Sequence, residues 1–254
     1  MYSNASLDFL EMLKNSKTKE PDTSKPKTND SKAKEIGSNQ LITVIDTETN
    51  WRDEVMSIGV ALADADSFKC VDTRYYIIDP EYKVGGIYSN VINYHSKNYG
   101  DKDTRNNQTE GVSNEFKGAA NISAPIGNSE IVCSRSEALN DIVQFLENNN
   151  IAKIFAYNAK FDYSHLRELS AFEWYDIMRL AAYKQYNRAI TEEMPCCKTG
   201  RLKTNYGVEP ITRMLSGDSR YCEVHNAIYD AVDELRIIEL LGHALDQYSC
   251  ARIN

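Results

Sequence analysis

The sequence predicts an α/β protein in which helices flank a mixed β-sheet, and three observations support this class. Residues 41–45, 55–63 and 74–78 are apolar runs joined by short links, which is typical of an antiparallel meander. A later apolar run over residues 151–157 follows an amphipathic segment, so helices and strands alternate after the meander. Parallel and antiparallel pairs are therefore both expected. We predict a sheet of five strands whose first three are antiparallel.

The helices are predicted from capping residues and from the spacing of apolar side chains. Ser134 and Glu137 have the spacing of a capping box, and apolar residues then recur on one helical face up to Leu146. Three asparagines at positions 148–150 are expected to end this helix. Four further helices are expected, over residues 161–169, 174–186, 210–215 and 227–245.

Two polar segments are expected to lie outside the packed core. Residues 1–40 should form a flexible tail, because residues 15–40 contain almost no large apolar side chain. Residues 6–13 have the pattern of a short amphipathic helix, which would either dock on a protein partner or fray. Residues 41–254 should form the functional domain, with a mobile insertion over residues 97–127.

Composition narrows the class of function. The formal net charge of −8 argues against a protein that binds nucleic acid tightly through many phosphate contacts. It does not exclude an enzyme that holds a strand end through metal ions. Residues 14–35 and 151–213 are locally basic, and each would either contact phosphates or form a solvated face.

The cellular environment is predicted from segments that the sequence lacks and from its cysteines. No apolar run has the length of a membrane helix, and residues 1–16 lack the pattern of a secretory signal. We expect a soluble, cytoplasmic protein. The six cysteines are scattered, and only Cys196 and Cys197 are neighbours, so reduced thiols are a better interpretation than a zinc site.

The first candidate site is a pair of carboxylates directly after the first strand. Asp46 and Glu48 are two residues apart, so on an extended chain their side chains point to the same side. Two close carboxylates raise each other's pKa, and a divalent cation between them removes that cost. Hard oxygen ligands suit Mg²⁺ or Mn²⁺. A solvated strand end is the simpler alternative.

Two later segments place further polar groups where strands or loops give way to helices. Asp162 follows the strand over residues 151–157 and falls at the start of a helix, where an ordinary helix cap is the alternative. His225 and Asp230 lie at the start of the last long helix. A surface histidine and an exposed acid are the alternatives there.

Together these segments form an ordered set: D-x-E at 46–48, N-x-x-F-D at 158–162 and H-N-A-x-x-D-A at 225–231. The set resembles the DEDDh (DnaQ-like) family of 3′→5′ exonucleases over roughly residues 41–245. The related DEDDy branch has a tyrosine four residues before its last aspartate. Here that position is Asn226, and His225 stands five residues before Asp230, so the histidine branch fits.

The resemblance implies a ribonuclease H-like fold and a site with two Mg²⁺ or Mn²⁺ ions. It implies that Asp46, Glu48 and Asp230 hold one ion. Asp46 would bridge to the second ion, with Asp162 nearby, and His225 would be the general base. It further assigns four residues to substrate contact, namely Thr47, Thr49, Asn158 and Phe161. The implied reaction releases nucleoside 5′-monophosphates from single-stranded DNA or RNA.

Other points stay open at this stage. Many relatives have His-Asn where this chain has Tyr157-Asn158, but that position is not a metal ligand. Trp51 would either stack on a terminal base or pack in the core. The alternative function is a catalytically inactive module that binds nucleic acid or protein on the same fold. Nothing in the sequence decides between DNA and RNA, or indicates the oligomeric state.

Overall fold

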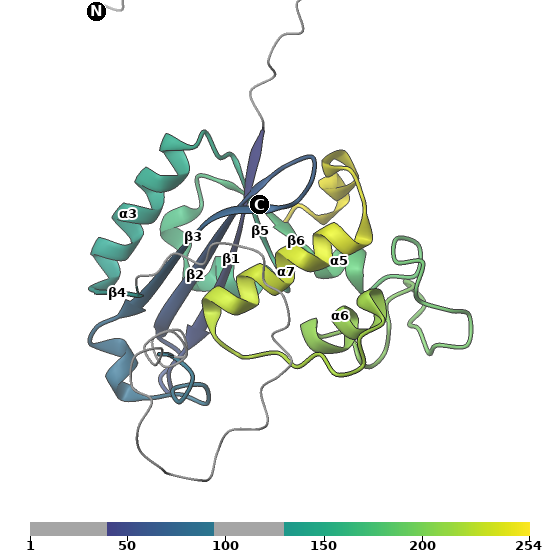
Figure 1. Ribbon diagram of the computed structural model, residues 1–254, viewed down its shortest axis with the longest axis horizontal. Coiled ribbons are helices and arrows are strands. Elements are labelled where there is room, and N and C mark those ends of the chain that lie inside the picture. The colour runs from purple at the N-terminus through teal and green to yellow at the C-terminus, as the bar shows by residue number, and fades with distance from the viewer. Residues whose placement is uncertain (1–39, 94–129) are drawn as a thin grey trace, which may run out of the picture. The chain divides into compact units, whose positions relative to one another are not determined.

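A computed structural model describes residues 40–93 and 130–254. The strands of these segments form one sheet in the order β4-β3-β2-β1-β5-β6 (Figure 1). The strands are β1 (Leu41–Thr49), β2 (Val55–Asp64), β3 (Cys70–Ile78), β4 (Glu130–Cys133), β5 (Lys153–Ala156) and β6 (Glu173–Asp176). The first three pair antiparallel, and β4, β5 and β6 each join the sheet in parallel. The predicted tail and the predicted insertion over residues 97–127 lie outside the described residues, apart from Gln40.

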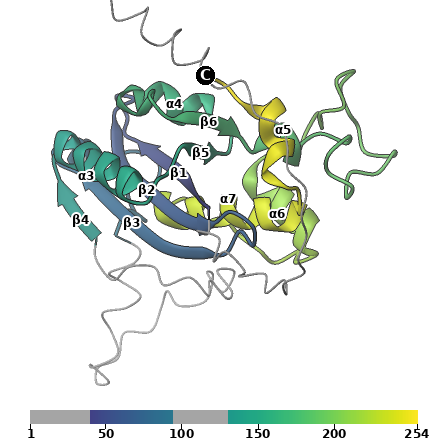
Figure 2. The ribbon, with the colours of Figure 1, turned by 90° about the horizontal axis from the view of Figure 1, so that it is seen from above.

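Helices cover both faces of the sheet (Figure 2). The α-helices are α3 (Arg135–Asn148), α4 (Lys160–His165), α5 (Met178–Ala181), α6 (Val208–Ser216) and α7 (Ala227–Leu241). The described residues also form three short 3₁₀ helices, η1 (Glu81–Val84), η2 (Arg167–Leu169) and η3 (Leu245–Ala251). The face that carries Val60 of β2 packs against α3, and the face that carries Ala61 packs against α5, α6 and α7. Within the described segments, no helix has the length and apolar character needed to cross a membrane.

The predicted class is confirmed: the sheet is mixed, its first three strands are antiparallel, and helices flank it as the ribonuclease H-like expectation requires. The predicted capping box is also present, because the Ser134 side chain accepts the Glu137 N–H while the Glu137 carboxylate accepts the Ser134 N–H. The last helix ends four residues earlier than predicted, at Leu241. Gly242 follows it with a φ of 64°, a left-handed conformation that favours glycine.

The predicted count of five strands was wrong, because the sheet has six. Strand β6 occupies residues where we expected a helix over 174–186, and only α5 is helical there. Trp174 in β6 is fully buried, and the Ile177 N–H after the strand donates to the Ala156 carbonyl. Pairing with β5 and burial of aromatic side chains therefore outweighed helical spacing. Strand β4 was not predicted.

The predicted helix over residues 161–169 is interrupted. Leu166 has a φ of −123°, outside the helical region, and separates α4 from η2. Leu166 is itself fully buried in the core between the sheet and α3. The break therefore turns this side chain into the core and keeps α4 short.

A glycine on β2 lets the start of α7 rest directly on the sheet. Gly59 lies opposite Asp46 in the pairing of β1 with β2. A Cβ atom at Gly59 would come within 2.1 Å of the Ala227 carbonyl oxygen, so no larger residue fits without a shift of the helix. This close approach brings the first turn of α7 beside the strand that carries Asp46.

Candidate active site

The three sequence segments meet in one cleft of about 500 Å³. Strands β1 and β5 run parallel, so their carboxyl ends meet at one edge of the sheet, and the start of α7 closes the cleft from one side. The cleft is lined by Asp46, Thr47, Glu48, Thr49, Asn50, Trp51, Ile87, Tyr88, Tyr157, Asn158, Phe161, Asp162, Gly207, Val208, Glu223, His225, Asp230 and Glu234.

Asp46 and Glu48 are residues of β1 itself, because the strand continues past its apolar part to Thr49. Alternation along the strand places both carboxylates in the cleft. The Asp46 Oδ2 atom is buried and has no hydrogen-bond partner among the described residues. Burial, then the nearby Glu223 and Asp162, raises the pKa of Glu48 to about 8. Burial, then Asp162 and Glu48, also raises the pKa of Asp46 well above its ordinary range.

Asp162 is joined to this pair through Thr47, the residue between the two acids, which lies 115 positions earlier in the sequence. The Thr47 hydroxyl and N–H both donate to Asp162 Oδ1, at 2.8 and 3.1 Å. The N-cap of α4 is Ala159, so the alternative of a capping role for Asp162 was wrong. Burial raises the pKa of Asp162 to about 7, although the hydrogen bonds from Thr47 act in the opposite direction.

The start of α7 is fixed by Asn226, which caps the helix. Its side-chain oxygen accepts the Ile228 N–H, and its amide donates to the Tyr75 hydroxyl and to the Val91 carbonyl. Asp230, one turn into the helix, is 3% exposed, and its Oδ1 atom has no hydrogen-bond partner within the described segments. Burial, followed by repulsion from Asp46, raises the pKa of Asp230 well above its usual value.

His225 is held at the mouth of the cleft. Its φ of 58° is unusual for a residue with a side chain, and such positions are enriched at functional sites. Its ring stacks on Tyr88, with centroids 4.3 Å apart. Its Nδ1 atom lies 3.9 Å from a carboxylate oxygen of Glu223. Burial lowers the pKa of His225, which Glu209 partly opposes, so the ring is neutral at pH 7.

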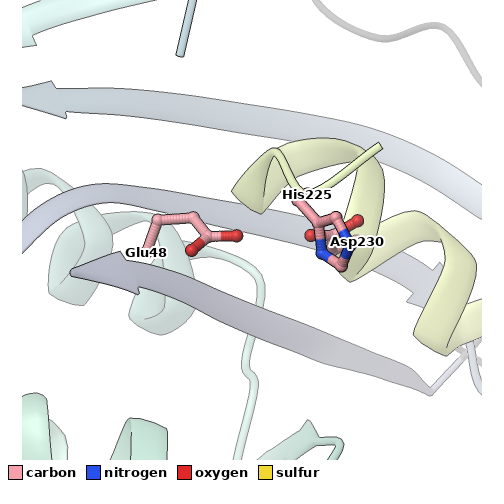
Figure 3. Close-up of side chains that lie close together, drawn as sticks. All are labelled: Glu48, His225 and Asp230. Carbon is pink, nitrogen blue, oxygen red and sulfur yellow. The ribbon is translucent and has the colours of Figure 1, made fainter. Parts of the chain in front are cut away.

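One group of side chains has the spacing of metal ligands. Donor atoms of Glu48, His225 and Asp230 all lie within 4.8 Å of one another, with Glu48 on β1 and the other two at the start of α7 (Figure 3). The resemblance implied Asp46 in place of His225 in this trio. Asp46 lies outside the group in the part of the chain that the structure describes, although it lines the same cleft.

The cleft is lined by two further acids, which the sequence analysis did not assign to the site. Glu234 is 2% exposed, accepts the Tyr157 N–H at 2.9 Å, and has a pKa raised first by burial and then by Asp46 and Asp162. Burial also raises the pKa of Glu223, to about 7. Glu234 stands four residues after Asp230, a helical spacing that could have indicated it. Glu223 lies in a loop and gave no such signal.

The residues assigned to substrate contact lie in the cleft with different exposure. Thr47 is 4% exposed and directs its hydroxyl to Asp162, so it supports the acid. Thr49 and Asn158 line the cleft, and Phe161 does so with 39% of its surface exposed. Trp51 is 67% exposed at the rim, so the alternative that it packs in the core was wrong.

Comparisons with known proteins find a likeness of fold. No protein-family model and no curated protein sequence matches the chain. The nuclease domain of 3′hExo, a DEDDh family member bound to rAMP, is 12% identical over 85% of this chain and 96% of that one, with a TM-score of 0.48. A full-length 3′-exonuclease is 12% identical over 85% and 90%, with a TM-score of 0.49. E. coli Exonuclease I in complex with an oligonucleotide is 12% identical over 83% of this chain and 42% of that chain, with a TM-score of 0.48.

Proposed function

We propose that this protein is a metal-dependent 3′→5′ exonuclease that hydrolyses single-stranded nucleic acid to nucleoside 5′-monophosphates. The observation that carries the proposal is the meeting of Asp46, Glu48, Asp162, Asp230 and His225 in one cleft. Residues far apart in the chain converge there, and their chemistry matches what hydrolysis of a phosphodiester requires.

The fit of a divalent metal rests on groups that the fold leaves unsatisfied. Asp46 Oδ2 and Asp230 Oδ1 are buried without a hydrogen-bond partner, and no lysine or arginine in the described segments forms an ion pair with either residue. Buried carboxylates of this kind are costly unless they are protonated or bind a cation. Oxygen donors of this type suit Mg²⁺ or Mn²⁺.

Asp46, Glu48 and Asp230 would hold one ion, and Asp162 with Asp46 would hold the second. When bound, such ions would supply activation of a water molecule and stabilisation of the departing 3′ oxygen. Thr47 fixes the Asp162 carboxylate toward the centre through its two hydrogen bonds. Strand β1 carries Asp46 and Glu48 to the cleft, α7 carries Asp230, and His225 lies just before the Asn226 cap of that helix.

His225 is the group that accepts a proton. Its lowered pKa keeps the ring neutral at pH 7, as a general base requires. Stacking on Tyr88 covers one face of the ring, and the Glu223 carboxylate lies 3.9 Å from Nδ1, so Nε2 is the nitrogen that would take a proton from water. The left-handed backbone at His225 sets the ring beside Asp230 and Glu48.

The rim of the cleft suits a single strand. Trp51 and Phe161 expose 67% and 39% of their surfaces there. Aromatic side chains stack on any base, which contributes about 1–3 kcal/mol per base without selecting a sequence. The substrate is therefore a single-stranded end of DNA or RNA.

One assay tests the proposal. Matched DNA and RNA oligomers labelled at the 5′ end should give a ladder of products that shorten from the 3′ end with Mg²⁺ or Mn²⁺. EDTA should suppress the ladder. A block on the 3′ end should also suppress it, whereas an endonuclease would still cut. Binding of the oligomers without any product, with every metal tried, would contradict the proposal and favour an inactive binding module.

A further inference from the structure

The segment that precedes α6 carries three cations and ends in Gly207 and Val208, two residues of the cleft lining. We propose that residues 194–208 bind the phosphates of the nucleotides that lie 5′ to the scissile bond. This inference rests on the proposed function, because it assigns the surface along which a single strand leaves the cleft. The cleft itself holds the 3′ end, where the carboxylates lie.

The charge of this segment differs from that of the chain as a whole. Between Glu193 and Glu209 the sequence contains Lys198, Arg201 and Lys203 and no acid, in a chain with a formal net charge of −8. Phosphate contacts in nucleic-acid complexes come mainly from lysine and arginine. A run of this kind next to an acidic cleft is therefore suited to an anionic strand.

The cations lie on an ordered turn. The Cys197 N–H donates to the Arg201 carbonyl, and the Lys203 N–H donates to the Pro195 carbonyl. The Lys184 N–H binds the Gly200 carbonyl and ties the turn to the chain that follows α5. Less entropy is lost when a strand binds to cations that are already positioned.

The two lysines of the turn are free to bind a ligand. Lys198 and Lys203 are exposed, and no acid among the described residues forms an ion pair with either of them. Arg201 is placed differently, because its guanidinium lies over the Tyr206 ring, 4.9 Å from the centroid. Lys198 and Lys203 are therefore the residues to test, whereas Arg201 also supports the fold.

The segment runs directly into the cleft. Gly207 and Val208 are part of the cleft lining. The Tyr157 hydroxyl donates to the Tyr206 carbonyl, so the end of the segment is fastened to a residue that lines the cleft. A strand whose 3′ end occupies the cleft can therefore continue onto this segment.

The rim at Trp51 is less suited to phosphates. Arg52 is followed there by two acids, Asp53 and Glu54, and nearby Lys83 is already paired with Asp79. Glu81 is also close, since its carbonyl accepts the Asn50 side-chain amide. Like charges would repel a strand there. The difference in charge between the two rims thus favours the side of residues 194–208.

The test compares two double variants of equal charge. Lys198→Glu with Lys203→Glu changes the proposed surface. Lys69→Glu with Lys83→Glu is the control, because these lysines are 63% and 58% exposed and lie outside residues 194–208. The measurement is the binding of a fluorescent single-stranded oligomer in Ca²⁺ at several salt concentrations. The oligomer has about 20 nucleotides, because single-strand sites cover ~4–16 nucleotides. Matching melting curves confirm that both variants fold.

We expect the Lys198/Lys203 variant to bind the oligomer roughly ten-fold more weakly or worse at low salt. The slope of log affinity against log salt should fall by about 1.4, because each phosphate contact to a single strand contributes about 0.7. The control variant should bind like the unaltered protein. Hydrolysis of a dinucleotide, whose one phosphodiester occupies the cleft, should be unchanged in both variants.

Equal affinity and equal salt slope in the Lys198/Lys203 variant and the unaltered protein would overturn the inference. Equal loss in the control variant would overturn it too, because net charge alone would then explain the effect. The binding measurement needs no hydrolysis, so it decides the surface separately from the activity. Failure of the unaltered protein to hydrolyse any oligomer would instead contradict the proposed function.

Discussion

Carboxylates inside the cleft and carboxylates elsewhere on this protein have opposite surroundings. Outside the cleft, Glu168 pairs with Arg135 at 3.0 Å and Glu173 pairs with Arg252 at 2.7 Å. Inside it, Asp46 and Asp230 have buried oxygens without a partner in the described residues. Arginines of the fold neutralise Glu168 and Glu173, whereas Asp46 and Asp230 have no such partner and are suited to bind a cation from solution.

The pKa values of Glu168 and Glu48 shift in opposite directions. For Glu168, burial acts to raise the pKa, but the hydrogen bond and charge of Arg135 outweigh it and the pKa is lowered. For Glu48, burial and the neighbouring acids act together and raise the pKa to about 8. Carboxyl groups whose pKa is strongly shifted by burial and neighbouring charges occur at functional sites more often than elsewhere. Burial alone does not mark a cleft acid, because it also raises the pKa of Asp233, which accepts the Tyr221 hydroxyl and does not line the cleft. At Glu48, neighbouring acids add to the effect of burial.

The largest expected effect comes from removing one charge in the cleft. Asp46→Asn should lower hydrolysis by about 1,000-fold or more, a loss of about 4 kcal/mol in transition-state stabilisation, because the residue would contact both ions. Glu168→Gln, which removes one charge outside the cleft, is the matched control and should leave the rate unchanged. Rates with a 5′-labelled oligomer measure both. Comparable losses in the two variants would remove the distinction between the two groups of acids.

The next effect concerns His225. His225→Ala should lower the rate by about 10²–10⁴-fold, as expected when a general base is removed. Because Glu48, His225 and Asp230 have the spacing of ligands, the variant also distinguishes two roles for the ring. A base leaves the affinity for Mn²⁺ unchanged, whereas a ligand lowers it. Robust hydrolysis by the variant would exclude His225 from both roles.

The smallest effect is on stability without metal. The pKa of Glu48 is raised from 4.5 to about 8 and that of Asp162 from 3.8 to about 7 in the folded state, so between these values the folded protein binds more protons than the unfolded chain. Stability contributed by the protonated groups is complete below pH 4 and is lost as the pH rises through about 7 to 8. In EDTA, the free energy of unfolding should therefore be lower at pH 8 than at pH 5.5 by on the order of 1–2 kcal/mol. The melting temperature should be lower at pH 8 as well.

Addition of Mn²⁺ should reverse this trend, since ligands must lose protons to bind a metal. The increase in melting temperature on adding Mn²⁺ should be larger at pH 8 than at pH 5.5. Glu168→Gln should behave like the unaltered protein in this experiment, because the pKa of Glu168 is lowered in the folded state. A melting temperature that rises steadily with pH in EDTA would show that the cleft acids carry no such cost.

Much of the fold was predictable because local signals agreed with tertiary structure. The apolar run before Asp46 predicted β1, and the capping box at Ser134 predicted α3. Strand β6 could not be predicted in this way. Glu173–Asp176 is four residues long, and its strand conformation depends on pairing with β5 and on the burial of Trp174. Such pairing is a long-range property that no short stretch of sequence contains.

The cleft was predictable where a motif marked it and not where the fold alone formed it. Asp46, Glu48, Asp162, His225 and Asp230 were indicated by three motifs, and the structure brings them into one cleft. The link from Thr47 to Asp162 depends on two hydrogen bonds between distant segments. The sequences of β1 and α4 gave no reason to expect that contact.

A calorimetric titration with Mn²⁺ near neutral pH tests most directly whether the cleft carboxylates bind a divalent cation. Binding should be measurable in the unaltered protein, should release protons into the buffer, and should be lost or strongly weakened in Asp230→Asn, whose buried oxygen lacks a partner. Absence of Mn²⁺ binding up to millimolar concentrations, or equal binding by the two proteins, would contradict the assignment of these carboxylates to a metal centre.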